Sequence, residues 1–369
     1  MERREFLRKA ALAALAVPAA LGGGAKYGYG DSGPLPAAQE GARPKMKRIA
    51  IEEHWGNKEL LEIRAQWEAR TGLPKTVDEA AIAHAFPRLG DFEKFRLPSM
   101  DEFDVTMQVL SIGSPGIQAI SDTFTAIDVA KRTNDFQAEI IRKYPDRFGG
   151  FAALPTQDPK AAADELERAV TQLGFRGAMI QGHTHWEYLD EPKYWLIWER
   201  AAALEVPIYL HVNEPSLDSI KMYAGHSELL GPTWAWGVET ATHALRIIGS
   251  GVFDAFPQAT LILGHLGESL PYLLGRFDEG YRMALKPKKL KKELSEYIRE
   301  NLLVTTSGKY EPEALICAIK AVGVDRVLFA VDYPFVLMKD SVELLERTAM
   351  SDSDREKIYH FNAERWLRL

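Results

Sequence analysis

The chain has 369 residues, of which 46% are hydrophobic and 26% charged, with a formal net charge of −7 at pH 7. These values are close to the averages of globular proteins, and they exclude a largely disordered chain or a protein with many membrane spans. The net charge is negative, and the sequence lacks the excess of basic residues that is typical of a nucleic-acid-binding protein. Cys317 is the single cysteine of the sequence. An intramolecular disulfide and a cysteine-built zinc site are therefore excluded, and any bound metal needs His, Asp and Glu ligands.

The N-terminus has the pattern of an export signal. Arg3 and Arg4 precede a weakly apolar run, Ala10–Leu21, which is shorter than the roughly 20 residues that cross a bilayer. A positive segment before a short apolar one is typical of a signal peptide, and the paired arginines resemble a twin-arginine signal. A basic start to an ordinary cytosolic helix is the alternative.

These features predict three segments. We expect residues 1–25 to be a twin-arginine-type signal peptide and residues 26–46, rich in Gly, Pro and Ala, to be a disordered linker. Residues 47–369 would form the folded domain. The mature protein would then be periplasmic, or otherwise exported, and would have no membrane span.

Eight short apolar runs predict buried parallel strands, because strands covered on both faces are hydrophobic almost throughout. The runs are Arg48–Trp55, Thr106–Gly113, Phe148–Leu154, Gly177–Gly182, Pro207–Val212, Thr260–His265, Leu302–Ser307 and Val327–Pro334. Segments of helical period separate them, and this alternation predicts an α/β fold, a (β/α)8 TIM-like barrel. A doubly wound open sheet is the alternative, although the glycine-rich motif of a dinucleotide fold is missing after the first run. Residues 57–103 are too long for a simple connection and predict a helical insertion over the barrel mouth.

Ionisable side chains occur where the first, fifth, sixth and eighth predicted strands end. Barrel enzymes place their active sites at these C-terminal ends. Glu52 and His54 are two residues apart, so both should face into the barrel, whereas Glu53 should face away. A buried Glu-x-His pair is costly without a partner, and a metal ion would be a natural one. His211, His265 and Asp332 follow at the other strand ends and complete the set.

The donors predict one divalent metal ion per chain. Glu52, His54, His211 and Asp332 offer oxygen and imidazole ligands, which suit Zn²⁺ or Mn²⁺, with Fe²⁺ also compatible. A catalytic ion also needs open positions for water or substrate. His265 is either a fifth ligand or a group that polarises the substrate, and Glu268 is spaced to orient it.

A second histidine pair, His183 and His185, follows the fourth predicted strand. The neighbouring residues are polar and aromatic, which indicates a loop. A loop does not ensure that both imidazoles point at the strand ends, so we expect a substrate-facing segment rather than a ligand pair. The alternative, that the two histidines bind metal, remains open on the sequence.

At these residues the sequence resembles the amidohydrolase superfamily. Within it, the chain is similar to the metal-dependent nonoxidative decarboxylases of the γ-resorcylate and 2,3-dihydroxybenzoate type, and more distantly to aminocarboxymuconate-semialdehyde decarboxylase. The matching motifs include Glu-Glu-His at residues 52–54, Gly-His-Leu-Gly-Glu at 264–268 and Val-Asp-Tyr-Pro-Phe at 331–335. They are spread over nearly the whole predicted domain.

The resemblance implies roles for individual residues. Metal ligands would be Glu52, His54, His211 and Asp332. Catalytic residues would be Asp332, His265 and Glu268, and substrate-binding residues would be Arg276 and Asn213. Three stretches depart from the resorcylate pattern and leave the substrate open: Val212-Asn213-Glu214 after the strand-five histidine, Gly113-Ser114-Pro115, and His183–His185.

The activity implied is nonoxidative decarboxylation of an aromatic, hydroxybenzoate-like acid with release of CO₂. Asp332 would deliver a proton to the ring carbon that bears the carboxylate, and no organic cofactor would be needed. The resemblance also implies a homo-oligomer, a dimer or tetramer. The alternative is a hydrolase of a lactone or amide on the same scaffold, in which Asp332 acts as a general base. A binding protein without catalysis is disfavoured because all the ligand positions are filled.

Overall fold

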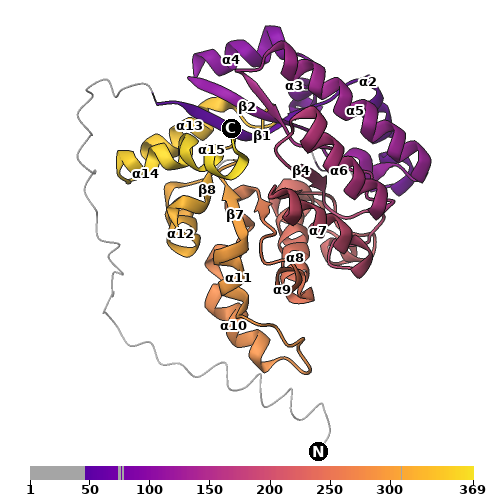
Figure 1. Ribbon diagram of the computed structural model, residues 1–369, viewed down its shortest axis with the longest axis vertical. Coiled ribbons are helices and arrows are strands. Elements are labelled where there is room, and N and C mark those ends of the chain that lie inside the picture. The colour runs from indigo at the N-terminus through magenta and orange to yellow at the C-terminus, as the bar shows by residue number, and fades with distance from the viewer. Residues whose placement is uncertain (1–45, 74–75, 77–78, 309) are drawn as a thin grey trace, which may run out of the picture. The chain divides into compact units, whose positions relative to one another are not determined.

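The computed structural model describes residues 46–73, 76, 79–308 and 310–369 (Figure 1). The predicted signal peptide and all of the predicted linker except Met46 lie outside these residues. The described residues belong to one compact unit. Within the described part of the chain, no helix combines the length and apolar character needed to cross a membrane.

Eight parallel strands form the centre of this unit. They are β1 (Arg48–Trp55), β2 (Val105–Ile112), β3 (Phe148–Gly150), β4 (Ala178–Gln181), β5 (Ile208–His211), β6 (Leu261–Leu263), β7 (Leu302–Thr305) and β8 (Val327–Leu328). The first three pair in sequence order, and so do the other five. Bridges between Ala152 and Ala178 and between Glu53 and Tyr333 join the two sheets at both seams. The strand order and the bridges match the predicted (β/α)8 barrel.

Several observed strands are shorter than the apolar runs that predict them, and β8 is the clearest case. The amide of Ala330 donates to Thr306 Oγ1, and the amide of Val331 donates to Glu53 Oε1, both at 3.0 Å. Side chains therefore accept the hydrogen bonds that these amides would donate to a neighbouring backbone in a longer strand. Asp332 follows with a φ of 74°, a left-handed conformation that ends extended structure.

Helices follow the strands on the outside of the sheets (Figure 1). The main ones are α5 (Thr123–Lys143), α6 (Pro159–Leu173), α7 (Trp195–Leu204), α8 (Ala235–Ser250), α9 (Val252–Ala255), α10 (Leu274–Met283), α11 (Leu294–Asn301), α12 (Pro312–Val322), α13 (Met338–Arg347), α14 (Asp352–Glu356) and α15 (Asn362–Leu367). Asp158 caps α6 by accepting from the amides of Lys160 and Ala161, as a typical N-cap does. Gly251, whose φ is 89°, separates α8 from α9.

The predicted insertion after β1 is helical. It contains α2 (Lys58–Thr71), α3 (Glu79–Leu89), a wide helical turn over Phe92–Arg96 and α4 (Leu97–Glu102). None of the residues of α2 is buried. By contrast, Arg96 in the wide turn is fully buried, so this turn reaches into the body of the protein.

A separate apolar cluster fills the barrel. Ile49, Val109, Met179, Ile262 and Leu303 come from five different strands and belong to this cluster. Burying each such side chain contributes about 1.5–3 kcal/mol. Apolar side chains therefore fill the barrel interior beneath the polar groups at the C-terminal strand ends.

Candidate metal centre

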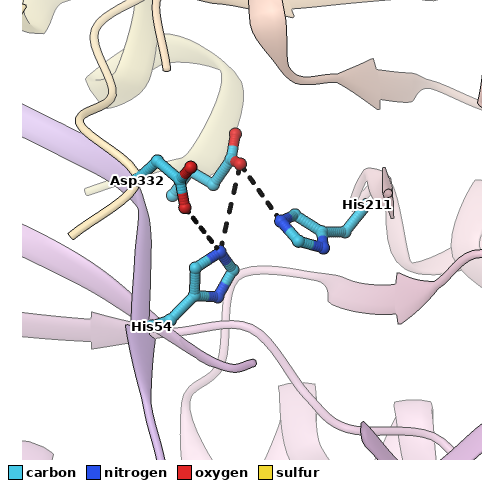
Figure 2. Close-up of side chains that lie close together, drawn as sticks. His54, His211 and Asp332 are labelled. Carbon is cyan, nitrogen blue, oxygen red and sulfur yellow. Dashed lines mark ion pairs between the residues drawn. The ribbon is translucent and has the colours of Figure 1, made fainter. Parts of the chain in front are cut away.

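Four side chains converge at the C-terminal ends of the strands. Glu52 and His54 come from β1, His211 ends β5, and Asp332 follows β8. One ligand atom from each lies within 4.8 Å of the others. Figure 2 shows His54, His211 and Asp332 pointing toward one another from these separate segments. They are the four residues predicted from the sequence as metal ligands.

The contacts within the cluster are short. His54 Nε2 lies 3.3 Å from Asp332 Oδ1 and 4.0 Å from Glu52 Oε1. His211 Nε2 lies 3.3 Å from the same Glu52 oxygen. Glu52 Oε1, His54 Nε2 and His211 Nε2 are buried and have no hydrogen-bond partner among the described residues. Such buried polar atoms are costly when unsatisfied, and a cation between them would satisfy all three.

Each of these ligands is oriented by a contact on its other side. His211 Nδ1 lies 3.1 Å from the carbonyl oxygen of Val212. Because a carbonyl only accepts, Nδ1 carries the proton and Nε2 keeps a lone pair for a metal. His54 Nδ1 contacts Ser111 Oγ at 3.2 Å. Tyr209 donates to Glu52 Oε2. Contacts of this kind fix the direction of metal ligands, so the residues present fit a divalent ion.

His265 lies beside this group rather than within it. Its Nε2 is 3.6 Å from Glu52 Oε1 and 3.8 Å from Asp332 Oδ2. Its Nδ1 is 2.7 Å from Glu268 Oε1, so Glu268 orients the ring as predicted. His265 and Glu268 have φ values of 53° and 52°. Positive φ in non-glycine residues is uncommon and occurs often at functional sites.

The charges of the site favour ionised carboxylates. Burial opposes ionisation of Glu52, but His265, His211 and His54 outweigh it and hold its pKa below the usual range. Burial likewise opposes ionisation of Asp332, but the adjacent side chains of His265 and His54 lower its pKa. Burial lowers the pKa of His265, but Glu268, Glu52 and Asp332 overcome this effect and raise it. Without a bound ion, the site therefore contains two ionised carboxylates, Glu52 and Asp332, and a protonated imidazole, His265.

A buried network behind the ligands was not predicted. Glu53 faces away from the metal cluster, as expected, and accepts from Val331 N at 3.0 Å and Gln108 Nε2 at 2.7 Å. Arg96 donates to the carbonyl oxygen of His54 and to Gln108 Oε1. Burial raises the pKa of Glu53, and Arg96 partly offsets this effect. The network ties the insertion to β1, to β2 and to the segment after β8.

Tyr310 is a second residue that the sequence did not reveal. A Cβ atom placed on Gly308 would lie 2.9 Å from Cε2 of Tyr310 and 3.2 Å from Cδ2 of His265. The two rings therefore border the same space above β7. Burial raises the pKa of Tyr310 to about 12, and the charges of His265 and Glu268 also act on it. The hydroxyl is protonated at neutral pH and can donate a hydrogen bond.

Comparison with known proteins places this geometry in a family. The amidohydrolase family model matches residues 80–369. The chain belongs to the amidohydrolase family. This amidohydrolase is 42% identical over 330 residues to the γ-resorcylate decarboxylase of Polaromonas sp. JS666, covering 87% of this chain and 98% of that protein.

Solved structures resemble this amidohydrolase as well. A dihydroxybenzoic acid decarboxylase from Polaromonas sp. JS666, with bound manganese and 2-nitroresorcinol, superposes with a TM-score of 0.81 at 42% identity over 88% of this chain and 97% of that one. A second structure is a 5-carboxyvanillate decarboxylase from Novosphingobium aromaticivorans with manganese and 4-hydroxy-3-methoxy-5-nitrobenzoic acid. It superposes with a TM-score of 0.82 at 32% identity, over 88% of this chain and 96% of that one.

The histidine pair after β4 stays outside the four-residue cluster of this amidohydrolase. His183 Nε2 donates to the carbonyl oxygen of Glu214 at 2.8 Å, and its Nδ1 accepts from Trp186 N at 3.4 Å. Burial lowers the pKa of His183 to about 4. The ring is therefore neutral, with both nitrogens occupied. His185 is exposed, and its Nε2 lies 3.0 Å from the carbonyl oxygen of Ile120.

The two predicted substrate-binding residues have different surroundings. Asn213 lines a cavity, but its amide donates to Gln181 O at 3.0 Å and accepts from Glu214 N at 2.9 Å. Arg276 is exposed on α10 and forms no hydrogen bond or ion pair with any residue that the structure describes. Substrate contact by either residue stays a prediction.

Proposed function

We propose that this amidohydrolase is a metal-dependent nonoxidative decarboxylase of an aromatic, hydroxybenzoate-like acid. The four-residue cluster with His265 beside it carries the proposal, because a bound ion and a charged imidazole would then face the same space. Support comes from relatives that are decarboxylases and from related structures that hold manganese beside aromatic ligands.

One divalent ion per chain fits the donors, and manganese is the first candidate. Two carboxylates and two imidazoles form a set without thiolate, which suits Mn²⁺ or Zn²⁺. Glu52, His54, His211 and Asp332 would hold the ion, which would supply positive charge opposite the anionic substrate. No step of the reaction transfers a hydride, so no organic cofactor is needed.

The residues of this chain would move one proton. Asp332 is ionised in the resting site, so it first takes the proton of the phenol next to the carboxylate. It then gives this proton to the ring carbon, the bond from that carbon to the carboxylate breaks, and CO₂ leaves. The product phenolate takes one proton from solvent, which balances the reaction. His265, held by Glu268, would donate to the phenolic oxygen while its charge develops.

A hydrolase on the same scaffold would use the same ligands, with Asp332 as a general base. No contact in the site favours it, and the relatives at 40–42% identity over 87% of this chain are decarboxylases. We therefore retain decarboxylation as the single proposed reaction.

Removing the metal tests this proposal. We expect dialysis against a chelator to abolish CO₂ release from a panel of 2-hydroxybenzoate, 2,6-dihydroxybenzoate and 2,3-dihydroxybenzoate. Adding about one equivalent of Mn²⁺ per chain should restore it, because the orphaned donor atoms converge on one point. Elemental analysis would follow occupancy in the same samples. CO₂ release that persists in metal-free protein would contradict the proposal.

A further inference from the structure

A cavity of about 380 Å³ lies between the helical insertion and the segment that follows β8. The insertion supplies wall residues from α3, the wide turn and α4, and the opposite wall is formed by residues between Tyr333 and Lys339. A cavity of about 150 Å³ holds one benzene ring, so this cavity has room for a larger molecule. Its volume lies in the range of small-molecule sites, about 300–1,000 Å³.

This cavity is separate from the metal cluster. None of the four candidate metal ligands is among its wall residues. The segment after Asp332 contributes to both places. The ring of Phe335 lies 6.0 Å from that of His54, whereas Pro334 and Val336 line the cavity. A molecule in the cavity would therefore contact residues that the proposed reaction does not use.

The cavity wall carries an excess of positive charge. Arg88 is half-buried, its Nη1 donates to the carbonyl oxygen of His84 at 2.6 Å, and its guanidinium lies 4.8 Å from the ring centroid of Phe95. Both contacts are to wall residues, so the guanidinium lies at the cavity. Arg88 and Lys94 form no ion pair with any carboxylate of the described residues. Glu102 is the acidic residue on the wall.

Tyr333 adds a buried polar group to this wall. Its hydroxyl oxygen has no hydrogen-bond partner among the described residues, and a buried hydroxyl without a partner is costly. Most of the other wall residues are apolar, among them Phe103, Leu337 and Met338. Apolar walls with a few polar groups are typical of sites for small molecules.

We propose that this cavity binds an organic anion that joins one carboxylate to an apolar body of about two fused rings. Arg88 would pair with the carboxylate, because a guanidinium matches its two oxygens. Tyr333 would donate a hydrogen bond to the ligand, and the apolar wall residues would cover the rings. The site goes beyond the proposed decarboxylation, since the metal cluster takes no part in it.

Two compounds of the same shape test the site. They are 2-naphthoate and 2-naphthamide, which share their rings and differ in the charge of one group. Calorimetry on the manganese-loaded protein measures binding of both compounds, and the titrations are repeated after dialysis against a chelator. Without the ion, the metal cluster lacks the positive charge that would hold a carboxylate there. A preference for 2-naphthoate that survives chelation is therefore not due to the metal.

Two variants locate the binding. Arg88→Gln removes the charge at the cavity. Tyr333→Phe removes the unpartnered hydroxyl and keeps the ring, so it tests the same site if Arg88→Gln does not fold. Arg142→Gln is the matched control, because Arg142 is exposed on α5, away from the wall residues.

We expect the wild-type protein to bind 2-naphthoate at least about 10-fold more tightly than 2-naphthamide, the range of one charge-assisted hydrogen bond. Arg88→Gln should lose this preference, Tyr333→Phe should bind 2-naphthoate about 3-fold more weakly or worse, and Arg142→Gln should match the wild-type protein. Equal binding of the two compounds, a preference that chelation abolishes, or an unchanged preference in Arg88→Gln would overturn the site. If Arg88→Gln does not fold, unchanged binding by Tyr333→Phe would overturn it.

A second copy of the chain is the alternative occupant, because Leu337 is 55% exposed at the cavity. Sedimentation velocity compares the wild-type protein with Leu337→Ser. We expect the same oligomeric state for both. Dissociation of an oligomer by Leu337→Ser would show that another copy covers the cavity, and it would overturn the proposed ligand.

Discussion

Asp332→Asn is expected to lower turnover by about 10²-fold or more, the lower end for loss of a positioned proton-transfer group. The variant keeps the size of the side chain and one oxygen donor for the metal, but an amide cannot carry the proton. His54 Nε2, 3.3 Å from Asp332 Oδ1, would still contact that oxygen. Metal content should decrease modestly, and substrate affinity should change much less than turnover. Steady-state kinetics with elemental analysis on the same sample separates these effects.

Asp164→Asn is the matched control, because Asp164 is an exposed carboxylate that pairs with Lys160 on α6. We expect wild-type turnover from it. Near-normal turnover of Asp332→Asn at full metal occupancy would show that Asp332 does not move the proton. The proposed mechanism would then be wrong even if the metal site is correct.

Glu52→Gln should abolish activity by a different route, the loss of the ion. Glu52 Oε1 contacts His54, His211 and His265, so its negative charge is central to the cluster. Mutation of residues that only support metal ligands lowers metal affinity by about 10- to 100-fold. Loss of a direct ligand should have a larger effect. Competition with a fluorescent chelator measures the affinity for Mn²⁺.

The neighbouring buried carboxylate supplies the comparison. Glu53→Gln changes the same functional group one residue away, and a glutamine can still accept from Val331 N. We expect a smaller loss of metal affinity than in Glu52→Gln. If both variants bind Mn²⁺ as tightly as the wild-type protein, the cluster is not the metal site.

The strands and the convergence of the four candidate metal ligands could be predicted because both follow local rules. Apolar runs mark buried strands, and the two-residue period of a strand places Glu52 and His54 on one face and Glu53 on the other. The end of β8 could not be predicted in this way. It is set by Thr306 and Glu53, which are distant in the sequence. Their side chains accept hydrogen bonds from the backbone amides of Ala330 and Val331.

Arg96 and Tyr310 show what a sequence does not reveal. Arg96 lies in an insertion and gains its role only when the wide turn brings it to the carbonyl oxygen of His54. Tyr310 follows β7 without a motif, and only folding brings its ring to the space beside His265. Neither residue has a spacing that indicates function. His183 carries such a spacing, yet its nitrogens bond to the backbone of Glu214 and Trp186.

Isotope transfer from solvent tests the central claim most directly. The manganese-loaded protein is incubated in D₂O with a hydroxybenzoate that it consumes, and gas and product are analysed by mass spectrometry and NMR. The account predicts one CO₂ per product molecule and one deuterium at the ring carbon that lost the carboxylate, because the transferred proton has exchanged with solvent. A product formed without CO₂, or with hydrogen at that carbon, would contradict proton transfer coupled to decarboxylation.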